Sequence, residues 1–180
     1  MSNRHPFELA VPVSPVDHIL GPEHAQITVV EYGDYECPNC KQAAPAVKLL
    51  LDHFPGRVRL VYRHYPLEEV HPHAMQAAQA AECAGAQGKF AAMHEMLFDN
   101  QQHLKINHLR GYAERLGLDM ARFIAEMDDE IYLQRIREHM AGGKASGVRA
   151  TPTFFINNKI QDVSFGLHAL VEGVEAALHR

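Results

Sequence analysis

Two cysteines separated by two residues, Cys37 and Cys40, are the part of this sequence best suited to do chemistry. The segment before them, 26–32, is rich in β-branched residues and predicts a strand, and the segment after them, 41–54, predicts a helix. Residues three apart on the first turn of a helix share one face, so the two thiols should come within disulfide distance. The spacing therefore predicts a redox-active disulfide.

The start of the helix predicts a different role for each cysteine. Pro38 suits the first helical position, where a missing N–H costs nothing. Cys37 then lies at or next to the N-cap, where unpaired backbone N–H groups and the positive end of the helix dipole stabilise a thiolate. Cys40 lies one turn further in and should be less exposed. We expect Cys37 to attack a disulfide and Cys40 to resolve the mixed disulfide.

The same pair could instead be half of a structural zinc site, or inert core residues. A structural zinc ion takes four ligands, usually from a second CxxC or a nearby pair of histidines. The only other cysteine is Cys83, in an Ala-rich helix, where a buried small hydrophobic residue is expected. The 13 histidines are scattered, and only His71 and His73 cluster, in a segment that reads as a loop. We expect no metal, and no cofactor beyond the Cys37–Cys40 disulfide.

Length and composition exclude several classes of protein. A chain of 180 residues, 47% of them hydrophobic, is long enough for one domain with a proper core. The formal net charge of −5 argues against a nucleic-acid partner, and no apolar stretch is long enough for a membrane helix. Residues 1–20 have no apolar segment typical of a signal peptide. The three cysteines fit a reducing compartment, so we expect a cytoplasmic protein without a membrane partner.

Strand and helix signals divide the chain into a core and an insertion. Residues 26–33 and 58–65 predict strands on either side of the 38–54 helix, which makes a βαβ unit with parallel strands. From about 71 to 140 only helical periodicity is present, and Gly142-Gly143 should end this block. Within it, the acidic run 128–130 is expected at a helix N-terminus, where negative charge is favoured.

The C-terminal part returns to the core. Residues 153–156 and 159–163 predict two strands joined by a two-residue turn at Asn157-Asn158, since Asn tolerates the positive φ of such a turn. An amphipathic helix follows over 167–178, and a further edge strand is expected over 7–13. Residues 1–66 and 145–180 are therefore assigned to an α/β core, and residues 67–144 to an all-helical insertion.

Three motifs in this order resemble the DsbA-like branch of the thioredoxin superfamily. They are residues 31–40, which contain Cys37-Pro38-Asn39-Cys40, residues 62–67 and residues 147–156, and the similarity extends over about 17–178. The resemblance implies a thioredoxin-like fold, with a central mixed sheet flanked by helices and an all-helical insertion domain. It also implies that the protein is a thiol–disulfide oxidoreductase.

The resemblance implies a surface that contacts the substrate. In the family, a cis peptide bond precedes the proline that corresponds to Pro152, and the backbone of the residue before it, here Thr151, pairs with an extended substrate strand. The alternative is that Pro152 only opens an edge strand. We expect Pro38, Asn39, Thr151 and Pro152 to bind protein or peptide thiols and disulfides.

The resemblance also draws attention to Glu31, which falls where the family can carry a buried acid beneath the active-site helix. A carboxyl group there could take or supply the proton of Cys40, and burial would raise its pKa towards neutrality. The alternative is a glutamate at a strand end that reaches solvent or pairs with Arg63.

The two residues between the cysteines bear on the redox potential. DsbA has a His at the second of these positions, which stabilises the thiolate, whereas Asn39 carries no charge. We therefore expect a less oxidising protein than DsbA, with glutathione or a thioredoxin-type protein as the recycling partner. Two other functions stay open on this fold. One is a glutathione-linked transferase or isomerase, and the other is a non-catalytic peptide-binding or chaperone module.

Overall fold

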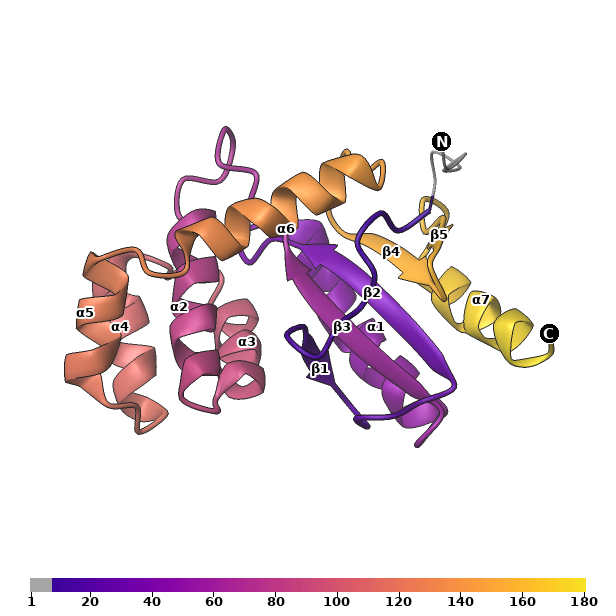
Figure 1. Cartoon of the computed structure of the whole chain (residues 1–180), viewed down its shortest axis with the longest axis horizontal. Coiled ribbons are helices and arrows are strands. Elements are labelled where there is room, and N and C mark those ends of the chain that lie inside the picture. Colours follow the sequence, from indigo (N-terminus) through magenta and orange to yellow (C-terminus); the bar gives the residue numbers. More distant parts are fainter. Residues whose placement is uncertain (1–7) are drawn as a thin grey trace.

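Two parallel strands form the centre of the computed structural model, which describes residues 8–180 (Figure 1). Three further strands extend the sheet in the order β1-β3-β2-β4-β5, each antiparallel to its neighbour. The strands are β1 (His18–Leu20), β2 (Ile27–Gly33), β3 (Val58–His64), β4 (Thr153–Ile156) and β5 (Lys159–Gln161). The mixed sheet flanked by helices confirms the expected fold class.

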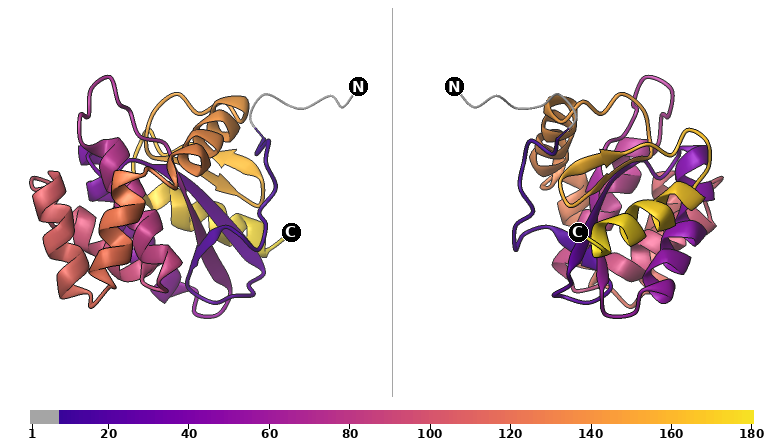
Figure 2. Two further views of the ribbon diagram at one scale, coloured as in Figure 1. Left: turned by 60° about the vertical axis from the view of Figure 1, so that its left-hand side comes forward. Right: turned by 90° about the vertical axis from the view of Figure 1, so that its right-hand side faces the viewer.

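Both faces of the sheet are covered, which is why β2 and β3 are buried along most of their length. Ile27 and Val29 of β2 pack towards one layer of helices, while Val30 and Tyr32 face the opposite side, as the two-residue period of a strand requires. The first layer consists of α1 (Pro38–His53) and α7 (His168–Leu178), and α6 (Leu133–Ala145) lies across the opposite face (Figure 2).

A second group of helices lies beside the sheet, between β3 and β4 in the chain (Figure 1). It consists of α2 (Ala74–Ala86), α3 (Phe90–Asp99), α4 (Ile106–Arg115) and α5 (Met120–Asp128), with α6 leading back to the core. Their apolar faces share one cluster with the side chains of Cys37, Cys40 and Tyr62. The helical group and the cysteine pair are therefore packed as one unit. No helix within residues 8–180 has the length and apolar character needed to cross a membrane.

The structure differs from expectation at the N-terminal end of the chain. The edge strand expected over 7–13 is wrong within the described residues, where a single bridge joins Glu8 to Lys159. Phe7 itself lies outside the described part of the chain. The edge strand is instead β1, which follows the N-terminal prolines, because a proline cannot donate to a strand ladder.

Two expectations about helix ends are also wrong. Gly142 and Gly143 do not end the helical block but lie inside α6. A Cβ atom on Gly143 would lie 2.9 Å from the Tyr65 ring and 3.0 Å from the Tyr32 ring, so the glycine lets α6 approach these aromatic side chains. The acidic run 128–130 begins at the last residue of α5 rather than opening a helix, and α6 starts only at Leu133. By contrast, the turn at Asn157-Asn158 is confirmed, with φ values of 44° and 72°.

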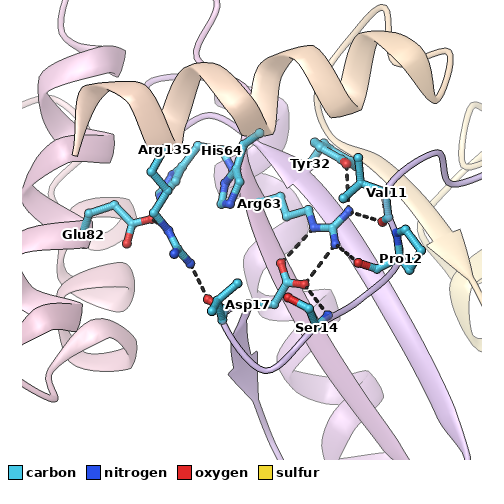
Figure 3. A network of polar contacts seen from close by, with 11 residues as sticks. Val11, Pro12, Ser14, Asp17, Tyr32, Arg63, His64, Glu82 and Arg135 are labelled. Carbon is cyan, nitrogen blue, oxygen red and sulfur yellow. Dashed lines mark hydrogen bonds and ion pairs between the residues drawn. The ribbon is translucent and has the colours of Figure 1, made fainter.

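A buried arginine holds the N-terminal segment against the sheet (Figure 3). Arg63, on β3, donates two hydrogen bonds of 2.9 Å to the carboxylate of Asp17. The same guanidinium group donates to the backbone carbonyls of Val11 and Pro12 and to the hydroxyl of Tyr32. Since both charged side chains are at most 5% exposed, each depends on the other to compensate its buried charge.

A second buried charge joins the helical group to the sheet. Glu82, on α2, is 3% exposed and accepts hydrogen bonds from Arg135 on α6, at 2.7 Å, and from His18 on β1, at 2.5 Å. Arg135 also donates to the carbonyl of Val16. Burial opposes ionisation, but the hydrogen bond from His18 and the contact with His64, whose Nε2 lies 3.3 Å from the carboxylate, prevail and hold the pKa of Glu82 below its usual range. Glu82 is therefore ionised, and its contact with Arg135 is an ion pair.

The first prediction concerns the Arg63–Asp17 pair. Arg63→Met should lower the free energy of unfolding by about 3–5 kcal/mol, because it leaves a buried carboxylate without its partner. The double variant Arg63→Met/Asp17→Leu should recover part of that loss, since no buried charge remains. Urea unfolding of the three proteins measures both effects. A single variant as stable as the wild type would contradict this role for the pair.

Candidate active site

The cysteine pair lies at the N-terminus of α1, as expected from the spacing. Cys37 is the N-cap residue, with φ −75° and ψ 122°, and Pro38 occupies the first turn. Cys37 is 5% exposed and Cys40 is fully buried, whereas Pro38 and Asn39 between them are exposed. The two exposed residues are therefore free to touch another molecule next to the sulfur of Cys37.

The sulfur of Cys37 is surrounded by hydrogen-bonding groups. Its Sγ lies 3.5 Å from the carbonyl oxygen of Thr151, on the loop before β4. A hydrogen bond from the Cys40 thiol, then contacts with Thr151 and the backbone N–H groups of Cys40 and Asn39, outweigh burial and lower the pKa of Cys37 to about 5. A cysteine with this pKa is a thiolate at neutral pH.

The loop opposite the cysteines contains the expected cis peptide bond, between Thr151 and Pro152. Thr151 is 6% exposed, and Pro152 is half-buried. A groove of about 760 Å³ runs past this loop and is lined on its α1 side by Asn39 and Gln42. The structure therefore brings Asn39, Thr151 and Pro152 together at one groove, with Pro38 exposed on the turn beside them.

Cys40 is held in the opposite protonation state. Its hydrogen bond to Cys37, its burial and the nearby charge of Glu31 all raise its pKa well above the ordinary value of a thiol. A protonated thiol is a poor nucleophile, so Cys40 needs a base before it can attack a disulfide.

Glu31 lies on β2 beneath this helix and is 3% exposed. Burial raises its pKa to about 8. The alternatives considered from the sequence are wrong, because the carboxyl group does not reach solvent and Arg63 pairs with Asp17 instead. A carboxyl group that titrates near neutrality beside Cys40 has the chemistry of a proton acceptor, a role that stays a prediction.

Asp34, whose role was not predicted from the sequence, stabilises the turn before the cysteines. It is buried and accepts hydrogen bonds from the backbone N–H groups of Glu36, at 2.7 Å, and Leu67, at 2.9 Å. It also contacts His71 Nδ1 at 2.7 Å, while His73 contacts the carboxylate of Glu36 at 3.1 Å. The two clustered histidines therefore tie the following loop to this turn. The Asp-x-Glu pattern is a local turn signal, but nothing local indicates the histidine partners.

Gln101, also missed, reaches this turn from the helical insertion. It is 7% exposed, and its side-chain nitrogen donates to the carbonyl oxygens of Tyr35, at 2.9 Å, and Cys37, at 2.8 Å. The pairs are separated by 66 and 64 residues in the chain, so no sequence pattern connects them.

Two other candidate groups lie away from this chemistry. Cys83 is buried, and burial is the main reason that its pKa is raised to about 12. Its thiol is therefore unreactive. Within the described residues, His64, Glu82 and His139 offer possible metal ligands within 4.8 Å of one another. Arg135 already neutralises Glu82, so a divalent cation there would bury two uncompensated positive charges. We therefore assign this cluster to the junction between sheet and helices.

A thioredoxin-like sheet, an inserted helical group and a cysteine pair facing a cis-proline define a class of enzymes, the thiol–disulfide oxidoreductases. Comparison with known proteins agrees. Residues 13–176 match the family model described as thioredoxin. The chain belongs to the thioredoxin family.

Solved structures support the same assignment. A thioredoxin-like oxidoreductase from Silicibacter pomeroyi superposes with a TM-score of 0.82 at 30% identity, covering 93% of this chain and 95% of that chain. BdbD from Bacillus subtilis also has a TM-score of 0.82, at 23% identity, and covers 91% of this chain and 94% of its own. Alpha-DsbA1 from Wolbachia pipientis has a TM-score of 0.79 at 19% identity, with 94% of each chain covered. The latter two show the shared fold.

Similar curated sequences belong to longer proteins. The Na(+)/H(+) antiporter NhaA 1 of Salinispora arenicola is 48% identical over 172 residues, which are 95% of this chain but 26% of the antiporter. The NhaA antiporter of Herminiimonas arsenicoxydans is 42% identical, over 96% of this chain and 27% of the antiporter. The chain thus spans about a quarter of the length of these relatives.

The second prediction follows from the low pKa of Cys37. In the reduced protein, the rate of alkylation by iodoacetamide should rise with pH around a midpoint near 5, and Cys37→Ser should abolish this phase. Because the folded pKa is lowered, the reduced protein should also gain stability relative to Cys37→Ser as pH rises from about 5 to about 8.5. A midpoint near 8.5, roughly the value of a free thiol, would contradict the stabilised thiolate.

The third prediction concerns Glu31, whose pKa is raised from 4.5 to about 8. Between these values the group is ionised in the unfolded chain but neutral in the folded one, so the wild type loses stability as pH rises. Glu31→Gln lacks this titration, so its stability advantage over the wild type should grow from pH 4.5 to about pH 8 and then level off. Urea unfolding at several pH values measures the difference. A constant difference would mean that Glu31 titrates normally.

Proposed function

We propose that this enzyme exchanges disulfides with protein or peptide substrates through Cys37-Pro38-Asn39-Cys40. The observation that supports this proposal best is the contrast between the two cysteines. The pKa of Cys37 is lowered to about 5, which favours an attacking thiolate, while that of buried Cys40 is raised. Such a pair can hold a mixed disulfide on Cys37 until Cys40 is deprotonated.

The proposed reduction proceeds in two displacements. The Cys37 thiolate attacks one sulfur of a substrate disulfide, the substrate S–S bond breaks, and a substrate thiolate leaves. The Glu31 carboxylate then takes the proton of Cys40, whose sulfur attacks Cys37 Sγ and releases the second substrate thiolate. The substrate gains two electrons, and Cys37 and Cys40 end as a disulfide. Oxidation of a substrate dithiol is the reverse sequence.

The proposed substrate site is the surface around the cis-proline. An extended peptide would pair with the backbone of Thr151, while Pro38, Asn39 and Pro152 contact its side chains. Main-chain pairing is insensitive to side-chain identity, so this mode suits many peptides. The groove beside Asn39 and Thr151 has room for the residues that flank the substrate cysteine.

The pKa of Cys37 bears on the direction of exchange. A value of about 5 falls between the pKa values of two attacking cysteines on this fold, about 3.5 in DsbA and about 7 in thioredoxin. A more stable thiolate makes the reduced form more stable and the protein more oxidising. We therefore propose a reduction potential between about −270 and −120 mV, with glutathione or a thioredoxin-type protein restoring the active form. The cytoplasmic location expected from the sequence stays a prediction.

The fourth prediction tests the exchange itself. Equilibrating the protein over a range of glutathione ratios and trapping its thiols should give a Cys37–Cys40 disulfide with a potential in the proposed interval. The reduced protein should also accelerate reduction of insulin, Cys37→Ser should not, and Cys40→Ser should accumulate mixed disulfides. Cys83→Ser is the matched control and should behave as the wild type.

The same experiment separates the alternatives. Insulin reduction that survives Cys40→Ser would favour a glutathione-linked enzyme, which needs a single thiol. Peptide binding unchanged by Cys37→Ser, without any accelerated reduction, would favour a chaperone-like module. If no Cys37–Cys40 disulfide forms at any glutathione ratio, the proposed function is wrong.

A further inference from the structure

An amide side chain from the helical insertion forms hydrogen bonds with the cysteine motif. Gln101 lies just after α3 and donates hydrogen bonds from one nitrogen to the carbonyl oxygens of Tyr35 and Cys37. The Tyr35 carbonyl belongs to the peptide group before Glu36, and the Cys37 carbonyl belongs to the peptide group after Cys37. The two groups therefore flank the Glu36–Cys37 unit. One side chain therefore sets the orientation of the backbone on both sides of that unit.

Gln101 is itself held in place. The residue before it, Asn100, ends α3 by donating from its backbone and its side chain to the carbonyl of Met96. The buried residue Leu104 follows, and its carbonyl accepts a hydrogen bond of 2.9 Å from Gln76 on α2. A side chain that is 7% exposed between two such anchors has little freedom to leave its partners.

Both residues whose carbonyls accept from Gln101 take part in further hydrogen bonds. The Cys37 carbonyl also accepts from the backbone N–H groups of Cys40 and Lys41, both at 3.1 Å, as the first turn of α1 requires. The insertion also contacts the side chain of Tyr35, since the Tyr35 hydroxyl lies 2.9 Å from Nδ1 of His94 on α3. The insertion thus fixes the residue two positions before Cys37 and Cys37 itself.

The orientation of Cys37 decides which groups its sulfur meets. The sulfur is stabilised by the Cys40 thiol, by Thr151 and by the backbone N–H groups of the first helical turn. Each of these contacts depends on the direction of the Cα–Cβ bond of Cys37, and hence on the two peptide planes that Gln101 holds. A rotation of the N-cap residue would weaken several contacts at once.

We propose that Gln101 is a positioning residue for the attacking cysteine, through which the helical insertion sets the reactivity of Cys37. The inference rests on the proposed thiol–disulfide exchange and adds to it a role for the insertion in the chemistry. The competing explanation is that Gln101 only satisfies two buried carbonyls and stabilises the fold. That explanation predicts lower stability with an unchanged thiolate.

The fifth prediction separates these explanations with three variants. Gln101→Met keeps the length of the side chain and removes its donors, Gln101→Glu keeps the shape but replaces the donors with a carboxylate, and Gln102→Met alters the exposed neighbour as a control. The readouts are the pH dependence of iodoacetamide alkylation, the equilibrium constant with glutathione, and the free energy of unfolding in urea.

We expect Gln101→Met to move the alkylation midpoint upward by about half to one pH unit, roughly three- to tenfold in the thiolate equilibrium, as for loss of one hydrogen bond. The equilibrium with glutathione should shift towards the oxidised protein by a similar factor, because the reduced form loses its stabilised thiolate. Gln101→Glu should shift both quantities in the same direction, and Gln102→Met should leave them at the wild-type values.

Either Gln101 variant that is less stable but keeps the wild-type midpoint and glutathione equilibrium would overturn the inference. If one variant fails to fold, the other supplies the same comparison. Failure of the proposed function is a different result, since the wild type itself would then show no low midpoint and no Cys37–Cys40 disulfide.

Discussion

A thiolate can persist inside a protein only where hydrogen-bond donors replace the water that it has lost. Here those donors are the Cys40 thiol and the first backbone N–H groups of α1, and with the contact to Thr151 they overcome the burial of Cys37. The elements around the cysteines bring these groups to one point. The β2–α1 junction supplies the N–H groups, and the cis-proline loop before β4 places the carbonyl oxygen of Thr151, 114 residues away in the chain, against the Cys37 sulfur.

The helical insertion is part of this arrangement and not a separate attachment. Its apolar core continues into Cys37, Cys40 and Tyr62, so the packing of the inserted helices and the packing around the disulfide are one cluster. Polar contacts reinforce the same link, from Gln101 to the cysteine turn and from Glu82 to the edge of the sheet. Because these contacts are buried, a shift of the insertion relative to the sheet would disturb the active site directly.

Buried ionisable groups occupy two distinct roles in this protein. Asp17 with Arg63 and Glu82 with Arg135 are paired, and the pairing keeps them charged while they join segments distant in the chain. Glu31 is buried without such a partner among residues 8–180, so its pKa rises to about 8 and it can change its protonation state near neutral pH. Burial without a countercharge in this part of the chain is therefore what suits Glu31 to proton transfer.

The sequence alone determined the features that depend on neighbouring residues. The spacing of Cys37 and Cys40, the strand–helix–strand order and the Asn157-Asn158 turn are local, so the pattern of side chains indicated them correctly. The cis bond before Pro152 and the position of Glu31 came from family resemblance. Only the tertiary structure decided that Gly143 lies inside a helix, that Arg63 pairs with Asp17, and that Gln101 holds the cysteine turn. The contacts that Gly143, Arg63 and Gln101 make join residues far apart in the chain, and such pairings leave no periodic signal in the sequence.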